Sequence, residues 1–247
     1  MKELLSDVMK QASSLFENVI VTGTEDSTVV DGCDKDKMFY LVASVKTSIP
    51  EFTGEFGIGS LPLLNGLLNF ASYKTDESKF IIHRKEHEGA EEVSEFEFRD
   101  RDGAKTKFKT ISPRFIGDGK KTSIGKIPWD TTVSMTKAKA SEIQQLAGLL
   151  TDVDKHFGLV VEDDKLFLTI GGKSEVTHAT TIFLADGVTS TLLNSNKFYY
   201  NMTNFLAVIK RAENSACKVS FCSRGVVGIT VETDHAVYNY YLRGNSN

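Results

Sequence analysis

One set of residues in this sequence resembles a catalytic metal site: His83, Glu86 and His87. The spacing H-x-x-E-H occurs in some zinc peptidases, where both histidines lie on one face of a helix and bind one ion. Here the surrounding segment FIIHRKE predicts a strand that runs into an acidic turn. Residues four apart in a strand are separated by about 13 Å, too far for two ligands on one zinc ion. We therefore expect no metal cofactor.

Other motifs with chemical meaning are weaker. The segment GDGKKTS, from Gly117, resembles a phosphate loop but lacks its first glycine and the Ser or Thr directly after Gly-Lys. Asp31, Asp34 and Asp36 are spaced like calcium ligands, without the glycine and final glutamate of a calcium loop. Asn201 opens a glycosylation sequon but better fits the cap of a helix. No nucleophile elbow or Cys–His dyad is indicated, so we expect a protein that is not an enzyme.

Cations suggest a different role, although the chain has a formal net charge of −4. Conventional DNA-binding domains are usually basic, so this balance argues against broad electrostatic capture of nucleic acid. Within the expected helices and their edges, however, cations outnumber acids by two. These cations are Lys2, Lys10, Lys74, Lys137, Lys139, Lys210 and Arg211. The pair Lys210–Arg211 follows a helical segment, where cations also favour the helix dipole by about 0.3–1 kcal/mol.

The elements that must position these groups are mostly strands. Short runs rich in β-branched and aromatic residues, such as KLFLTI and VVGITVE, are separated by turn pairs such as Asp186-Gly187. Short connections of this kind predict largely antiparallel sheets. Four segments instead have a helical period of about 3.6 residues: 6–19, 60–70, 139–150 and 202–212. Ser6 and Ser60 are the expected caps of the first two helices.

The order of these elements is duplicated. Each half has a helix, a run of strands, a second helix and further strands, and corresponding helices lie roughly 135 residues apart. We predict an N-terminal domain at 1–111, a connector at 112–126 and a C-terminal domain at 127–247. The connector is rich in glycine and basic residues, and the segment 109–130 around it contains two of the four prolines.

Three features bear on the compartment. The cysteines are odd in number, three, and have no C-x-x-C spacing, which indicates reduced thiols. No segment approaches the apolar run of about 20 residues that a membrane span needs. Acids occupy the N-terminus where a secretory signal would be apolar. We expect a cytoplasmic protein that does not engage a membrane.

Several segments, in order and spacing, resemble the sliding clamp (DNA polymerase processivity factor) of T-even-type bacteriophages. They are FTGEFGIGSLPLLNGLLNFASY, GKIPWDTTVSMTKAKASEIQQLAGLL, KFYYNMTNFLAVIKRAENSACKVSFC and AVYNYYLRG. The resemblance covers nearly the whole chain and rests on order, length and duplication more than on any single motif. The chain departs from the phage pattern in a longer acidic hairpin, KEHEGAEEVSEF, and a longer connector.

This resemblance implies an α+β DNA-clamp fold of two similar domains, each with two helices backed by antiparallel sheets. It implies a head-to-tail homotrimeric ring around double-stranded DNA, held without regard to base sequence. The implied partners are the replicative DNA polymerase and a clamp loader ATPase, in the cytoplasm of an infected bacterial host.

The resemblance also assigns roles to residues. The seven cations named above would face DNA phosphates, with Lys210 and Arg211 opposite the buried Phe205 and Ile209. A polymerase peptide would dock at Phe115, Ile116, Tyr240, Tyr241 and Leu242. The strand VYNYYLR could equally bury alternate tyrosines in its sheet. Two other functions stay open: a β-rich viral scaffold or assembly protein without a DNA channel, and a small hydrolase that uses the scattered histidines.

Overall fold

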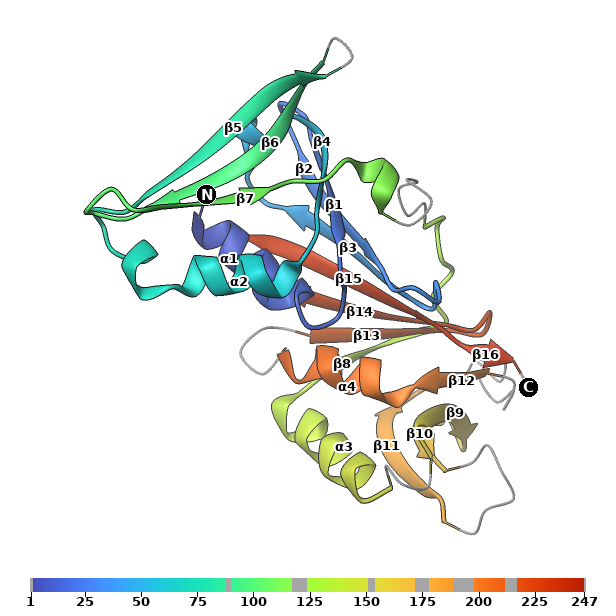
Figure 1. The fold of residues 1–247 in the computed structure, drawn as a ribbon. Helices are drawn as coiled ribbons and strands as arrows, with labels where there is room; N and C mark the ends of the chain where they lie inside the picture. The colour runs from blue at the N-terminus through green and yellow to red at the C-terminus, as the bar shows by residue number, and fades with distance from the viewer. Residues whose placement is uncertain are drawn as a thin grey trace. The chain divides into compact units, whose positions relative to one another are not determined.

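The computed structural model describes residues 2–87, 90–116, 124–150, 154–171, 178–188, 198–211 and 217–246. The chain forms two compact units (Figure 1). Unit 1 contains Met1–Ser123 and Thr233–Tyr238, and unit 2 contains Ile124–Glu232 and Asn239–Asn247. Asp7 of unit 1 contacts the C-terminal segment Thr233–Tyr238, because its Oδ2 accepts hydrogen bonds from Thr233 Oγ1 at 2.6 Å and from the Tyr238 hydroxyl at 2.7 Å.

Unit 1 places two helices against antiparallel strands. Its helices are α1 (Lys2–Ala12) and α2 (Leu61–Asn69), which pack side by side (Figure 1). Its first strands are β1 (Val19–Gly23), β2 (Thr28–Cys33), β3 (Phe39–Val45) and β4 (Gly54–Ile58), in the sheet order β4-β1-β2-β3. A second sheet has the order β5-β6-β7, from β5 (Lys79–His87), β6 (Ala90–Arg99) and β7 (Lys105–Lys109).

Aromatic side chains fill the core of unit 1. Strand alternation turns Phe96, Phe98 and Phe108 to one face of the β5-β6-β7 sheet, where each is at most 6% exposed. Phe56 of β4 meets Phe96 edge-on, with ring centroids 6.1 Å apart. Three short 3-10 turns, η1 (Pro50–Phe52), η2 (Ala71–Tyr73) and η3 (Pro113–Phe115), connect these strands and helices.

Unit 2 repeats this plan. Its helices are α3 (Lys137–Leu150) and α4 (Met202–Ile209). One sheet has the order β11-β10-β9-β12-β16, from β9 (His156–Glu162), β10 (Lys165–Ile170), β11 (Thr180–Asp186), β12 (Phe198–Asn201) and β16 (Asn245–Ser246). A second set of strands includes β8 (Thr131–Met135), β13 (Cys217–Cys222) and β14 (Val226–Glu232). Strand β15 (Ala236–Arg243) is divided between the units.

The expected organisation is confirmed: each half has two helices packed on antiparallel strands. The predicted first helix, at 6–19, was wrong in its limits. The helix begins at Lys2 because Leu4 and Leu5 extend its buried face, so Ser6 is internal and does not cap it. Phe16 fits the helical period but is buried in a loop, stacked on Phe39 with ring centroids 5.2 Å apart.

Of the caps predicted for the other helices, that of α4 is confirmed and that of α2 is wrong. Asn201 caps α4 as predicted, since its side chain accepts a hydrogen bond from the Asn204 N–H at 2.9 Å. Ser60 precedes α2 in a left-handed conformation, φ 48°, and its side chain makes no cap hydrogen bond. None of the helices in the described part of the chain combines the length and the apolar character that crossing a membrane requires.

Candidate functional site

In unit 1, two of the predicted DNA-binding cations lie at one hollow in the surface. Lys2 and Lys74 line it together with Ser78, Phe80 and Asp76, among others. Lys2 Nζ donates a hydrogen bond to Ser78 Oγ at 3.3 Å. Partial burial lowers the pKa of Lys2, and the charge on Lys74 lowers it further. Within the described residues neither ammonium forms an ion pair, so an anion bound here would relieve their repulsion. Lys10, the third predicted DNA-binding cation of unit 1, is exposed in the last turn of α1.

In unit 2, the two cations at the start of α3 differ. Lys137 is exposed at the first residue of the helix. The Lys139 ammonium already has two partners within unit 2: its Nζ lies 2.7 Å from Glu142 Oε2 and 5.7 Å from the centre of the Phe183 ring. A contact between Lys139 and another anion would have to compete with both of these interactions.

The structure also separates Lys210 from Arg211. Lys210 follows the last turn of α4 and is exposed, on a helix that buries Phe205 and Ile209; its contact with DNA stays a prediction. Arg211 is half-buried, which lowers its pKa, and its guanidinium hydrogen-bonds the buried Tyr240, which opposes that shift. Arg211 is therefore engaged inside unit 2 rather than directed at solvent.

Of the two predicted partner-binding residues of unit 1, Phe115 has the exposure that docking needs, whereas Ile116 is partly buried. Phe115, in η3, is 81% exposed. The neighbouring Ile116 lies against the backbone of β4, where a Cβ on Gly57 would come within 2.5 Å of its Cδ1. The Gly57 N–H also donates to the Ile111 carbonyl at 2.8 Å. The absent side chain of Gly57 thus allows Ile111 and Ile116, which flank η3, to lie close to β4.

Only one of the three predicted residues of β15 remains available. Tyr240 and Leu242 are 0% and 1% exposed, so their side chains hold the sheet together and cannot contact a partner directly. Strand alternation places Tyr241 on the opposite, half-exposed face. Tyr241 stacks on Trp129, with ring centroids 6.5 Å apart and planes 11° from parallel. Sequence reasoning missed Trp129, although a lone tryptophan beside the connector was a usable signal.

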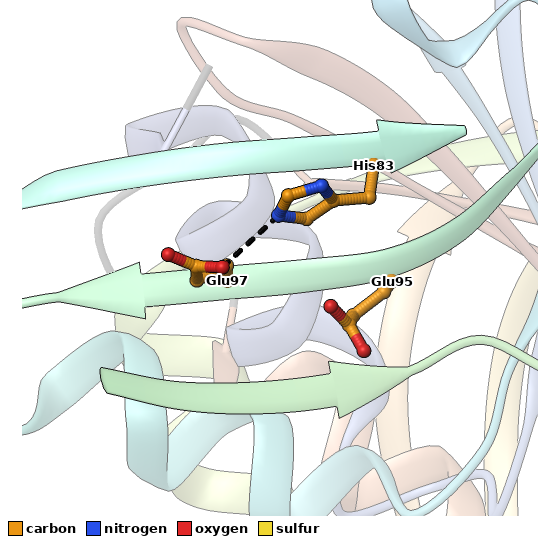
Figure 2. Close-up of side chains that lie close together, drawn as sticks. All are labelled: His83, Glu95 and Glu97. Atoms are coloured by element: carbon orange, nitrogen blue, oxygen red, sulfur yellow. Dashed lines mark hydrogen bonds and ion pairs between the residues drawn. The ribbon is translucent and has the colours of Figure 1, made fainter.

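His83, Glu95 and Glu97 are the one metal-ligand cluster among the described residues (Figure 2). Their ligand atoms lie within 4.8 Å of one another. Both carboxylates already have cationic partners, because Arg99 Nε donates to Glu97 at 3.0 Å and Lys107 Nζ to Glu95 at 2.5 Å. The group is therefore electrically neutral with His83 uncharged, and a divalent ion would add two unbalanced charges. We interpret it as a structural ion-pair network. The predicted strand at 80–86 is confirmed, and β5 extends one residue further, to His87, which was expected in the acidic turn.

This network predicts a loss of stability in acid. Hydrogen bonding from Arg99 holds the pKa of Glu97 below its ordinary value, with help from His83 and against the effect of burial. A carboxyl group with a lowered pKa stabilises the fold fully above its unfolded pKa of about 4.5 and loses that contribution as the pH falls towards the folded pKa. We expect Glu97→Gln to flatten the dependence of the unfolding free energy on pH below about 4.5. Denaturant unfolding at several pH values measures this, with the exposed Glu25→Gln as the control; equal slopes in wild type and Glu97→Gln would contradict it.

Comparison with known proteins gives no match by sequence but extensive matches by structure. The sequence matches no protein-family model and no curated protein. The whole chain nevertheless superposes on solved structures. PCNA from Thermococcus kodakaraensis matches at a TM-score of 0.69 and 11% identity, over 99% of this chain and 97% of that one. The present chain has the sliding-clamp fold.

Two further structures support that assignment. PCNA from A. fulgidus, bound to the C-terminal region of FEN-1, gives a TM-score of 0.69 at 11% identity, over 100% of this chain and 96% of that one. Proliferating cellular nuclear antigen from Entamoeba histolytica gives 0.66 at 13%, over 99% and 96%. The expected clamp fold is confirmed. At these identities the likeness establishes the clamp fold alone, and what the chain does must be argued from its residues.

Proposed function

We propose that this protein is a sliding clamp that encircles duplex DNA as a closed ring of three copies and tethers a replicative DNA polymerase. The observation that carries the proposal is the match of the complete chain, both units included, to clamp structures. The role is mechanical, and we assign no catalytic residue. We further propose that the chain comes from a T-even-type bacteriophage and works in the cytoplasm of an infected bacterium, as its segment order suggests.

A ring explains how an acidic protein can stay on DNA. Each phosphate neutralised by a cation adds affinity through counterion release, and strong binding of this kind would hinder sliding. A closed ring needs few such contacts, because leaving the DNA requires opening a contact between copies. The exposed Lys10, Lys74, Lys137 and Lys210, with Lys2, are the cations that we propose face the phosphates. Lys139 and Arg211 contribute less because other groups in unit 2 already engage them.

Polymerase tethering would use the exposed apolar residues. We propose two candidate docking surfaces for a short polymerase peptide: Trp129 with Tyr241 in unit 2, and Phe115 with Ile116 in unit 1. Aromatic residues of this kind often dominate the energy of protein interfaces. The sequence has no phosphate loop, so the energy for opening the ring would come from a separate clamp loader ATPase.

Retention on circular DNA tests the function. After loading onto nicked circular duplex, we expect the protein to remain bound through a wash in high salt and to dissociate when one cut linearises the DNA. Lys210→Ala should preserve this retention, because geometry and not charge prevents escape. Dissociation of the protein from circular and from linear DNA at equal rates in high salt would contradict the proposal.

The alternative, a scaffold protein without a DNA channel, makes a different prediction about mass. A ring requires a species near three times 27.3 kDa in solution, whereas a scaffold does not. Equilibrium sedimentation distinguishes the two directly.

A further inference from the structure

The duplicated order of elements allows each strand of unit 1 to be compared with a strand of unit 2. Strands β5, β6 and β7 follow α2 along the chain, as β13, β14 and β15 follow α4. In unit 2, β8 pairs antiparallel with β13 on the side that β14 does not occupy. In unit 1, β5 lies at the margin of its sheet (Figure 1), and among the described strands it pairs only with β6. One edge of β5 therefore lacks the neighbour that β13 has.

This open edge leaves apolar side chains partly uncovered. Val219 and Phe221 of β13 are 0% exposed, and β8 contributes to that burial, with Val133 directly opposite Val219. The corresponding positions of β5 are Phe80 and Ile82, because the segments KFIIH and KVSFC occupy the same place in the two halves. Both side chains turn to the core side of their sheet, yet both remain partly exposed. An added strand would bury apolar surface there, as β8 does in unit 2.

The open edge has a defined length. It begins at Lys79 and ends at the register shift between His83 and Arg84, where the Arg84 guanidinium turns to the backbone of η1. The five residues from 79 to 83 equal β8 in length and include no proline. The edge of such a strand presents unpaired N–H and C=O groups, which an added strand can complete.

A surface hollow lies at the beginning of this edge. It has a volume of about 700 Å³, and its walls include Phe80 of β5 and Leu68 of α2. Lys2 and Lys74 also line it, and Lys2 Nζ donates a hydrogen bond to Ser78 Oγ, on the residue that precedes β5. Apolar and cationic groups therefore meet where the open edge begins.

The cations make this end of the edge suitable for an anion. Glu3 and Asp76 line the hollow as well, but the charge that acts on Lys2 is that of Lys74, which lowers the pKa of Lys2 in addition to the larger effect of burial. A carboxylate between the two ammonium groups would relieve their repulsion.

We propose that the open edge of β5 binds an extended peptide of a partner protein, which adds as an antiparallel strand and places a carboxylate beside Lys2 and Lys74. Strand β8 supplies the template. Its C-terminal residue, Met135, lies opposite Cys217, where β13 begins. A peptide paired with β5 in the same way would end at the hollow. Its alternate apolar side chains would cover Phe80 and Ile82.

The apolar part of the site favours a peptide over nucleic acid. A phosphate backbone could pair with Lys2 and Lys74, but it would leave the hydrogen-bonding groups of β5 without partners. The inference goes beyond the proposed clamp function and does not depend on ring formation. Because we also propose that Lys2 and Lys74 face DNA phosphates, one copy can use them for only one ligand at a time. The peptide is therefore tested without DNA.

A peptide that copies β8 tests whether the edge accepts a strand. The probe is a labelled peptide of residues 130–135, DTTVSM, with a free C-terminal carboxylate, and fluorescence anisotropy measures its affinity for the full-length protein. Two further forms are N-methylated, one at the valine and one at the serine. Successive N–H groups point to opposite sides of a strand, so only one form loses a hydrogen bond to β5. We expect that form to bind at least about tenfold more weakly, and the other within about threefold of the parent peptide.

The carboxylate is tested by a double-mutant cycle. Amidation of the peptide, or Lys2→Ala with Lys74→Ala in the protein, should each weaken binding by about threefold, the effect of an exposed ion pair. The two changes together should weaken binding no further, because each removes the same contact. Lys105→Ala is the matched control: it removes a cation from β7, at the opposite edge of the same sheet, and should leave the affinity unchanged.

Joining a strand to the protein tests the same edge without a free peptide. Residues 130–136, DTTVSMT, are placed directly before Lys2, since Thr136 joins β8 to α3 in the same manner. We expect the thermal midpoint to rise by at least about 2 °C and the labelled peptide to be excluded. The same segment with aspartate in place of its valine should give no rise.

Each outcome decides the inference. Equal affinities of the two N-methylated forms would mean that charge alone holds the peptide, and would overturn strand addition. Stabilisation by the joined segment without binding of the free peptide would assign the edge to a segment of the same chain and overturn the separate partner. Neither binding nor stabilisation would overturn the whole inference. Retention on circular DNA is a separate measurement, so each of these results leaves the clamp proposal standing.

Discussion

Replacing Gly23 with alanine is expected to destabilise unit 1 by roughly 3 kcal/mol, near the upper end of what overpacking usually costs. Gly23 is the last residue of β1, and its Cα lies against the backbone of η1. A Cβ there would be 2.1 Å from the Phe52 carbonyl oxygen and 2.6 Å from its carbonyl carbon. Backbone atoms cannot rotate out of the way as a side chain can. Either β1 or η1 must therefore move, and Phe52 is part of the aromatic core with Phe56 and Phe96.

Gly66 provides the matched control. It lies in α2 of the same unit, and a Cβ added there would meet no atom within 4 Å beyond the backbone of its own helix. Gly66→Ala should stabilise the protein by about 0.5–1 kcal/mol, because alanine restricts the unfolded chain and favours the helix. Denaturant midpoints of the two variants give the comparison. Equal midpoints would show that the contact between β1 and η1 is more adaptable than the distances indicate.

Much of the fold follows from local patterns in the sequence. Alternation and turn pairs predict strands such as β10 and β14, and helical periodicity predicts α2, α3 and α4, because burial on one face dominates the stability of each element. The limits of α1 could not be predicted in this way. Phe16 and Val19 continue the helical period, but neither lies in α1. Phe16 is buried in a loop, stacked on Phe39, and Val19 is buried at the start of β1. Tertiary packing outweighs local preference there.

The candidate site was harder to predict, because exposure and partners depend on contacts distant in sequence. Lys210 and Arg211 are adjacent, yet only Arg211 meets Tyr240, a residue that follows it by many positions. Similarly, nothing local in VYNYYLR decides which tyrosines face outward. Register in the sheet buries Tyr240 and leaves Tyr241 beside Trp129. The sequence could supply the candidates but not the choice among them.

Loss of the Trp129–Tyr241 stack is expected to weaken binding of a polymerase terminal peptide by about tenfold or more, the effect of losing an aromatic hot spot. The structure offers two routes to that loss. Trp129→Ala removes the indole. Gly228→Ala keeps it but displaces it, because a Cβ at Gly228 of β14 would lie 2.5 Å from Trp129 Cη2. The indole lies flat on this strand only because residue 228 has no side chain.

These two routes make the prediction specific. If both substitutions act by removing the same surface, adding Gly228→Ala to Trp129→Ala should weaken peptide binding no further, because there is no longer an indole to displace. Fluorescence titration with a labelled peptide of the polymerase terminus measures each affinity, and Leu149→Ala, which truncates a side chain 78% exposed elsewhere in unit 2, is the control. Additive losses would mean that Gly228→Ala damages the sheet in general. Unchanged affinity in all three variants would move the docking surface away from Trp129 and leave Phe115 and Ile116 as its remaining anchors. If Gly228→Ala weakens peptide binding in the wild type but not in the Trp129→Ala variant, then peptide binding depends on the stacked aromatic pair itself.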